Sequence, residues 1–196
     1  KEGTPLEQAI HVCSEIGRLR KVLLHRPGGE LENLMPEYLE RLLFDDIPYL
    51  EEARREHDAF ADCLRKAGVE VLYLTDLVAE SFVSEFLTEG GVTEERQRRA
   101  LEDFLAPLGD KALVEQCMAG IRKSQLRRGG RLADFTAAGE EDYPFAIDPL
   151  PNLYFTRDPF ACIGGGVSLH RMHTLTRNRE TIFGKFLFEY HPEYKD

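Results

Sequence analysis

The stretch Pro149–Pro159, PLPNLYFTRDP, places an amide, two aromatic rings, a cation and a carboxylate among three prolines. Proline fixes its own backbone angle, lacks an N–H donor and disfavours a helical residue before it. We therefore expect an extended or turned segment rather than a helix. Polar side chains on rigid, irregular segments often face a ligand. The carboxylate of Asp158 suits a planar cation such as a guanidinium, whose paired N–H donors match its two oxygens.

The polar and aromatic residues of this stretch recur every three positions, at Asn152, Phe155 and Asp158. Because successive side chains of a strand point to opposite faces, a straight strand would direct Phe155 away from the other two. The segment must therefore bend or coil if all three side chains face one pocket. The sequence leaves open the alternative that Phe155 is a core residue and Asn152 a turn residue.

Residues 1–75 show strand and helix patterns in alternation. Residues 18–26 place apolar side chains among charges and stop at a proline and a glycine, which is typical of a strand and a turn. Helices are expected over about 36–43 and 48–68, and residues 69–74 predict another strand. Strand, helix and strand in this order indicate an α/β fold.

Residues 76–140 show only helical patterns, so we expect an inserted all-helical subdomain. Helices are predicted over 76–87, from Thr93, and from Asp110 to about residue 128, because a capping or acidic side chain stands at the start of each. Their apolar side chains are expected to form a core rather than a ligand site: Phe82, Phe86, Leu101, Phe104, Leu105 and Leu113.

Residues 141–196 return to an α/β pattern. Residues 160–163 and 167–169 flank three glycines, which predicts a β-hairpin. Residues 179–190 carry apolar side chains at helical spacing and predict an amphipathic helix.

Four segments of the chain resemble, in the same order, sequence signatures of the arginine deiminase family. They are residues 14–28 (SEIGRLRKVLLHRPG), 42–46 (LLFDD), 151–159 (PNLYFTRDP) and 177–181 (RNRET). Any one match carries little weight alone, whereas four in order extend over nearly the whole chain. Motifs of this kind are hypotheses that their structural context must support.

The resemblance implies a fold, a partial pentein α/β propeller made of the early ββαβ blades. Residues 1–75 would form the first part of the propeller and residues 141–196 its truncated continuation. The segment 76–140 would be the inserted helical subdomain. The chain would then provide about half of the usual length of the family.

The resemblance also implies a role for individual side chains. Asp158 would be catalytic, as one of two carboxylates that bind the substrate guanidinium and hold its central carbon for attack. Asn152 and Phe155 would contact the substrate through the amide and the ring. Arg177 would pair with the α-carboxylate of the substrate, and Leu43 would offer its backbone carbonyl from a mobile loop.

Each of these residues also has an ordinary structural interpretation. An aspartate before a proline, as at Asp158, is also typical of a turn. Arg177 could form a surface salt bridge with Glu180, and Leu43 could be a core leucine. The sequence alone does not separate these interpretations from the functional ones.

The activity that the resemblance implies is the hydrolysis of L-arginine to L-citrulline and ammonia through a covalent cysteine intermediate. The nucleophilic cysteine, a histidine and a second aspartate of the family would lie beyond residue 196, so we expect this chain alone to be inactive. Two alternatives remain open, another guanidino-modifying pentein enzyme such as an amidinotransferase, and a truncated, non-enzymatic binding module.

Composition limits the partners. A net charge of −10 argues against nucleic-acid binding, no apolar run reaches the length of a membrane helix, and four scattered cysteines indicate reduced cytosolic thiols. His170 and His173 have no acidic or thiol ligand beside them, so they are not expected to bind a metal. The resemblance implies that no cofactor is needed and that the partner is L-arginine. The cytoplasm is the expected compartment, and a homo-oligomer is left open.

Overall fold

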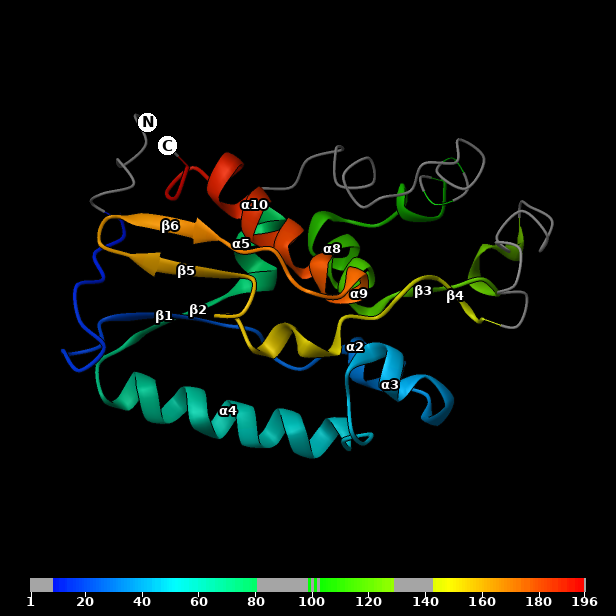
Figure 1. Cartoon of the computed structure of the whole chain (residues 1–196), viewed down its shortest axis with the longest axis horizontal. Coiled ribbons are helices and arrows are strands. Elements are labelled where there is room, and N and C mark those ends of the chain that lie inside the picture. Colours follow the sequence, from blue (N-terminus) through cyan, green and yellow to red (C-terminus); the bar gives the residue numbers. More distant parts are fainter. Residues whose placement is uncertain (1–8, 81–98, 100, 102, 129–142, 196) are drawn as a thin grey trace.

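The computed structural model describes residues 9–80, 99, 101, 103–128 and 143–195, which form a mixed α/β arrangement (Figure 1). Within these residues the strands form three separate two-stranded sheets, with helices packed between and beside them. The α/β class expected from the sequence is confirmed. None of the helices described is both long and apolar enough to cross a bilayer.

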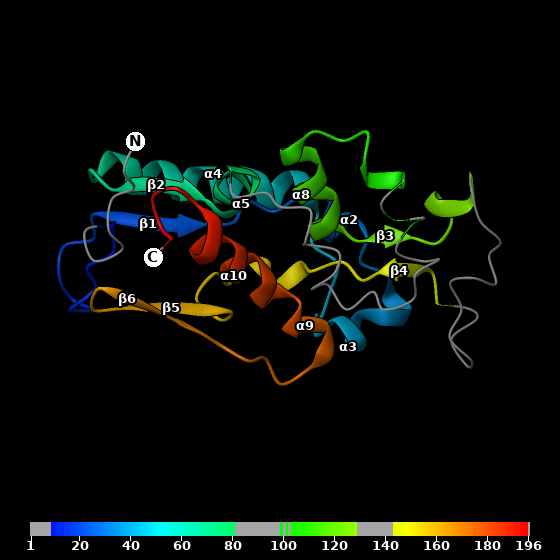
Figure 2. The ribbon, with the colours of Figure 1, turned by 90° about the horizontal axis from the view of Figure 1, so that it is seen from above.

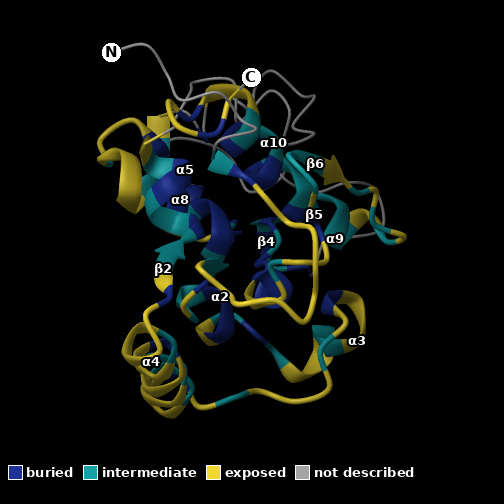
Figure 3. Ribbon diagram, turned by 90° about the vertical axis from the view of Figure 1, so that its left-hand side faces the viewer, coloured by how far each residue is buried: buried dark blue, intermediate teal, exposed yellow. Residues whose placement is uncertain are grey.

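A parallel strand pair begins the fold. β1 (Lys21–Leu24) pairs with β2 (Glu70–Tyr73), with Val22 opposite Val71. The 17-residue helix α4 (Leu50–Lys66) lies between them in the chain and provides the long crossover that a parallel pair needs. Figure 3 shows that much of the outer side of α4 is exposed. Both strands and this helix were predicted, with slightly longer bounds.

Three short helical turns connect β1 to α4. They are α2 (Gly29–Glu32), η1 (Pro36–Tyr38) and α3 (Leu39–Leu42), and the last two confirm the helix predicted near residues 36–43. Leu43 ends α3 in the left-handed conformation, with φ of 55°. The turns pack on the start of α4 through a small apolar cluster, Leu31, Leu34, Leu42 and Leu50.

The main core lies where three helices meet, α5 (Leu74–Glu80), α8 (Asp110–Ala119) and α10 (Glu180–Tyr190). Seen from above, α10 lies between the β1–β2 pair and the C-terminal hairpin (Figure 2). The described helices of the segment 76–140 therefore share a core with α10. That this segment forms a separate subdomain stays a prediction. Buried side chains of this core include Leu74, Val78, Leu101, Leu105, Met118, Phe183 and Leu187.

The start of α5 differs from the prediction. The helix begins at Leu74, directly after β2, so Asp76 lies in its first turn and pairs with Lys111 at 2.6 Å instead of capping it. Complete burial of Leu74 in the core explains the earlier start, because packing can outweigh a local capping preference. The rest of this predicted helix and the helix start predicted at Thr93 fall in residues 81–98, outside the described part of the chain.

The end of α8 also differs from the prediction. The helix begins at the expected aspartate but ends earlier, because Gly120 adopts φ of 83° and ψ of 164°. The short strand β3 (Ile121–Arg122), which the sequence did not predict, then pairs antiparallel with β4 (Phe145–Ile147). The turn η2 (Gln125–Arg128) follows β3. The remainder of the predicted helical region, from residue 129 to 140, lies outside the described residues.

The predicted C-terminal hairpin is confirmed. β5 (Phe160–Ile163) and β6 (Gly166–Leu169) pair antiparallel, and Gly164 takes φ of 60° at the turn. Val12 adds a bridge to this turn through reciprocal backbone hydrogen bonds with Gly164, each 2.8 Å long. The short helix α9 (Leu175–Asn178) leads into α10, so the predicted amphipathic helix is confirmed as well.

Gly120 generates a stability prediction, because no other residue fits its position. A Cβ atom there would lie 2.6 Å from the backbone nitrogen of Pro149, and the conformation is nearly restricted to glycine. We expect Gly120→Ala to lower the free energy of unfolding by about 2–4 kcal/mol, the sum of overpacking and backbone strain. Urea denaturation of the purified protein measures this change.

Gly68→Ala is the matched control. Gly68 also has a positive φ, of 80°, but its Cβ would meet no atom closer than 3.6 Å. This variant should therefore show the backbone cost alone, about 1–2 kcal/mol. Equal losses in the two variants would show that the contact with the Pro149 backbone does not matter.

Candidate functional site

The proline-flanked segment coils before β5. Its first turn is the 3-10 helix η4 (Pro151–Tyr154), and two further turns follow through hydrogen bonds from Phe155 N to Asn152 O and from Asp158 N to Phe155 O, both 3.0 Å long. The prediction that the segment bends or coils is confirmed. The expectation that it contains no helix was wrong for η4, because proline is well tolerated in the first turn of a helix.

Buried contacts hold this segment against the rest of the fold. Leu150 N donates to the carbonyl of Met118 at the end of α8, at 3.0 Å. The hydroxyl of Thr156 donates to the carbonyl of Leu23 in β1, also at 3.0 Å. Leu153 is fully buried between these two anchors. The segment is thus fixed at both ends by elements that lie far away in the sequence.

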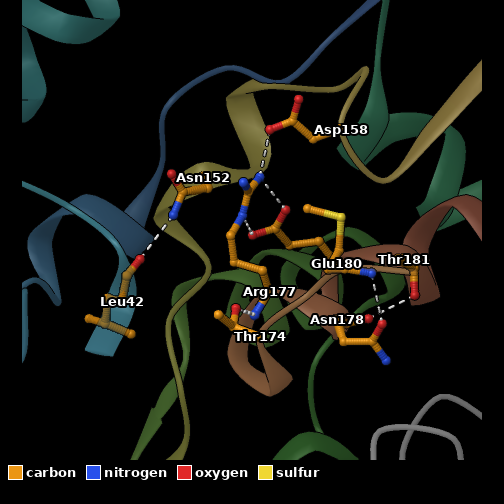
Figure 4. Close-up of polar contacts among 9 residues, drawn as sticks. Leu42, Asn152, Asp158, Thr174, Arg177, Asn178, Glu180 and Thr181 are labelled. Carbon is orange, nitrogen blue, oxygen red and sulfur yellow. Dashed lines mark hydrogen bonds and ion pairs between the residues drawn. The ribbon is translucent and has the colours of Figure 1, made fainter. Parts of the chain in front are cut away.

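Asn152 connects the segment to α3. The residue is 5% exposed, and its side-chain amide nitrogen donates to the carbonyl of Leu42 at 2.9 Å (Figure 4). Leu42 is the core leucine here, with no exposed surface, whereas Leu43 is 49% exposed. The core interpretation of Leu43 was therefore wrong. Because Leu43 adjoins the carbonyl that Asn152 binds, the two predicted residues come close together.

Phe155 is a surface residue. The residue is 45% exposed, so the interpretation of Phe155 as a core residue was wrong. The ring packs on Tyr154, with centroids 4.0 Å apart and planes tilted by 37°. Tyr154 in turn makes an edge contact with Phe44, which follows α3. These contacts orient an open aromatic surface beside the coiled segment.

Asp158 and Arg177 meet in a three-residue network with Glu180 (Figure 4). Nη2 of Arg177 donates to Oδ2 of Asp158 at 2.9 Å. Nε and Nη2 of Arg177 also donate to the two carboxylate oxygens of Glu180, each at 2.9 Å. The salt bridge with Glu180 considered from the sequence exists, but it is not at the surface, because Glu180 is 1% exposed. Arg177 comes from α9 and Glu180 begins α10.

Burial and the neighbouring charges shift the pKa values of Arg177 and Glu180 in opposite directions. Burial works against the charge of Arg177, but hydrogen bonds to Glu180 and Asp158 outweigh it and raise the pKa of the guanidinium. Burial raises the pKa of Glu180, and Arg177 counteracts part of that rise. One guanidinium faces two carboxylates, so when all three are ionised the network carries one excess negative charge. Such a site favours a cationic ligand.

His170 fixes the backbone of Asp158. Its Nδ1 donates to the carbonyl of Asp158 at 2.8 Å, and its backbone N–H donates to the carbonyl of Pro159 at 2.9 Å. His173 is exposed. Across the described ranges, no group of three or more histidine, cysteine or acidic residues lies close enough to hold a metal ion. The structural role of His170 is therefore the support of the turn that carries Asp158.

The four cysteines are free thiols in different environments. Burial raises the pKa of Cys117 to about 12, and it also raises the pKa of Cys162. Such thiols carry little thiolate, the form that attacks electrophiles. Cys13 and Cys63 are exposed and lie outside the network that contains Asp158.

The sequence missed two features of this site. The first is the carbonyl of Leu42, because nothing in two consecutive leucines tells which one turns its carbonyl to Asn152. The second is the burial of Glu180. Its spacing of three residues from Arg177 indicates a helical ion pair, but only tertiary packing makes that pair a buried one.

The buried ion pair predicts strong coupling between its members. Arg177→Leu should leave the buried carboxylate of Glu180 without its partner and lower the free energy of unfolding by about 3–5 kcal/mol. Glu180→Leu should cost less, though more than about 1 kcal/mol, because Arg177 keeps its contact with the exposed Asp158. The double variant should recover most of the loss, because leucines can replace the pair without leaving a buried charge. Urea denaturation in a double-mutant cycle measures the coupling. Single losses below about 1 kcal/mol, the range of exposed pairs, would contradict the assignment.

Comparison with known proteins shows a similarity over most of the chain. A sequence model of a family described as arginine deiminase matches residues 40–196. The matched region contains the coiled segment, α9 and the start of α10, and so every residue of the network.

Curated relatives agree with this match. An arginine deiminase of Streptococcus agalactiae serotype Ia is 57% identical, an arginine deiminase of Streptococcus uberis 55%, and one of Streptococcus gordonii 56%. Each alignment covers 94% of this chain and 48% of the relative. The chain therefore spans about half the length of the curated relatives it matches.

Proposed function

The chain belongs to the arginine deiminase family, and we propose that it is the N-terminal part of an enzyme that hydrolyses L-arginine to L-citrulline and ammonia. The observation that best supports this proposal is that Asp158 already binds a guanidinium, that of Arg177, at 2.9 Å. The excess negative charge of the network supports it as well. The relatives favour a deiminase over the amidinotransferase considered from the sequence.

Asp158 would bind the guanidinium of the substrate. Its 42% exposed carboxylate can turn toward a ligand, while hydrogen bonds from its own N–H and to its own carbonyl hold its backbone. Charge-assisted hydrogen bonds to the guanidinium would place the central carbon for attack and favour positive charge there. The exposed ring of Phe155 offers a face on which a planar cation can pack.

Three other residues would bind the rest of the substrate. Arg177 would pair with the α-carboxylate, since a guanidinium binds a carboxylate through two parallel hydrogen bonds. Asn152 would contribute its amide group, whose nitrogen is already bound to the carbonyl of Leu42. Leu43 would contribute its backbone carbonyl from the left-handed turn that ends α3.

The covalent step would need groups beyond this chain. A cysteine thiolate would attack the guanidinium carbon, ammonia would leave, and water would hydrolyse the resulting intermediate to citrulline. A histidine would transfer the protons, and a second aspartate would complete the binding of the guanidinium. The proposal requires no cofactor or metal.

The complete fold, the cellular compartment and the metabolic process are also proposals. The small sheets and helices would belong to a partial pentein propeller, with the segment 76–140 as its helical insertion. The four free cysteines fit a reducing compartment, and we propose the cytoplasm. Arginine metabolism would be the process served.

The chain by itself should lack activity. Purified and incubated with L-arginine, it should form no citrulline, because neither the buried thiol of Cys117 nor the partly buried thiol of Cys162 provides a reactive thiolate. The exposed Cys13 and Cys63 lie outside the network that contains Asp158. A colorimetric citrulline assay tests this, with the full-length enzyme as the positive control. Citrulline formed by the chain and abolished by Cys162→Ala would place the nucleophile within it.

Asp158→Asn in the full-length enzyme tests the central role. The amide keeps nearly the same shape but loses the negative charge and one acceptor. Charge-assisted hydrogen bonds contribute about 1.5–3 kcal/mol each, and loss of alignment adds to that, so kcat should fall about a hundredfold or more. Steady-state kinetics measure the change, and circular dichroism verifies folding.

Arg177→Lys is the comparison for that variant. It keeps a positive charge but cannot form the planar two-bond contact, and it acts on the carboxylate of the substrate rather than on the reacting carbon. The Michaelis constant should therefore rise more than kcat falls. Near-normal turnover by a folded Asp158→Asn variant would show that the proposed function of this site is wrong.

A further inference from the structure

Arg177 and Asp158 are bound to each other, although the proposed function needs them at opposite ends of one substrate. Their side chains meet at 2.9 Å. In L-arginine the guanidinium and the α-carboxylate are separated by the whole alkyl chain. The two side chains therefore cannot hold both ends of the substrate while they remain in contact, so the ion pair must open before the substrate is fully bound.

We propose that the Arg177–Asp158 ion pair keeps the empty site closed, and that the carboxylate of the substrate opens it by taking the place of Asp158 on Arg177. The pair would then select guanidino compounds that carry a carboxylate. This inference rests on the proposed function and adds to it a device for substrate selection.

The geometry of the Arg177 guanidinium supports this exchange. One edge, formed by Nε and Nη2, is fully used by the carboxylate of Glu180. The other edge is formed by Nη1 and Nη2, and there Asp158 accepts from Nη2 alone. No described residue accepts a hydrogen bond from Nη1 in the contacts of this network. A carboxylate that used both donors of this edge would displace Asp158 from Nη2.

Burial indicates which side chain moves. Glu180 is 1% exposed and the side chain of Arg177 16%, whereas that of Asp158 is 42% exposed. Glu180 therefore holds Arg177 in place as a positioning residue. The backbone of Asp158 is fixed by Phe155 and His170, but among the residues described its carboxylate binds only Arg177. Rotation of the Asp158 side chain is thus sufficient to open the pair.

The exchange balances for a zwitterionic substrate. L-Arginine breaks one ion pair and replaces it with two, its carboxylate on Arg177 and its guanidinium on Asp158. A guanidino compound without a carboxylate must break the same pair and leaves that edge of Arg177 without an anion. The ion pair therefore disfavours such compounds, in addition to the contact with Arg177 that they lack because they have no carboxylate.

The test compares L-arginine with agmatine, the analogue that lacks the carboxylate, in the full-length enzyme. The variant is Arg177→Gln/Glu180→Gln, which removes the ion pair, leaves no unpaired charge at the buried position 180, and frees the exposed carboxylate of Asp158. We expect its kcat/KM for L-arginine to fall and its kcat/KM for agmatine to rise about tenfold over wild type, a factor that corresponds to about 1.4 kcal/mol. An Arg177 that only contacts the carboxylate would leave agmatine turnover unchanged.

The matched control is Arg26→Gln/Asp58→Asn. Arg26 and Asp58 form a two-bond ion pair at 2.7 Å between the end of β1 and α4, and both are about half exposed. This variant should leave both substrates within about twofold of wild type, since exposed pairs contribute little. A similar rise for agmatine in the control would show a general charge effect and overturn the inference.

A second measurement does not depend on the folding of the variant. Sodium acetate provides a carboxylate separately from the guanidinium, so it should increase the turnover of agmatine by the wild-type enzyme, whereas sodium chloride at equal ionic strength should not. Agmatine turnover that does not rise, either in the folded variant or with acetate, would overturn the role of the ion pair. If L-arginine is still turned over, the proposed function remains. Absence of L-arginine turnover by wild type would overturn the proposed function itself.

Discussion

The site depends on the ion pairs that the guanidinium of Arg177 forms. This guanidinium joins three parts of the chain, because Arg177 lies in α9, Glu180 begins α10, and Asp158 ends the coiled segment before β5. Two carboxylates compete for one cation, and only the Glu180 pair is deeply buried. Because of this difference in burial, the contact of Arg177 with Glu180 stays in place, whereas its contact with Asp158 can be exchanged. A binding site built this way has a fixed cation and a movable anion, both needed for a zwitterionic ligand.

The fold provides rigid support for this arrangement. The coiled segment is held by hydrogen bonds to the carbonyls of Met118 and Leu23, and Asn152 ties it to α3. Gly120 allows the backbone to pass close to Pro149, where any side chain would collide. The residues of the site therefore stand on a segment that cannot shift without disturbing the core. Freedom remains mainly in side chains such as Asp158 and Phe155, which are partly exposed.

Much of the fold could be predicted from local patterns. The two strands on either side of α4, the helix itself and the glycine hairpin were all predicted, because hydrophobic periodicity and turn residues determine such elements locally. The start of α5 at Leu74 and the early end of α8 at Gly120 were not, since both follow from tertiary packing. The propeller and the helical subdomain stay predictions.

The sequence proposed the residues of the candidate site but could not predict their geometry. Sequence signatures pointed to Asp158, Arg177, Asn152, Phe155 and Leu43, and spacing indicated that the segment coils. Sequence could not show that Glu180 is buried, that Leu42 accepts from Asn152, or that Asp158 already binds a guanidinium. These features depend on contacts between residues distant in the chain, which local patterns do not encode.

The most direct test of the account is a crystal structure of the full-length enzyme with L-arginine bound, in a variant that lacks the nucleophile. In this complex the carboxylate of Asp158 should have left Arg177 and should bind the guanidinium of the ligand. Arg177 should retain both hydrogen bonds to Glu180 while its other edge binds the carboxylate of the ligand. A complex in which L-arginine is bound and the contact between Arg177 and Asp158 remains at hydrogen-bond distance would contradict the account.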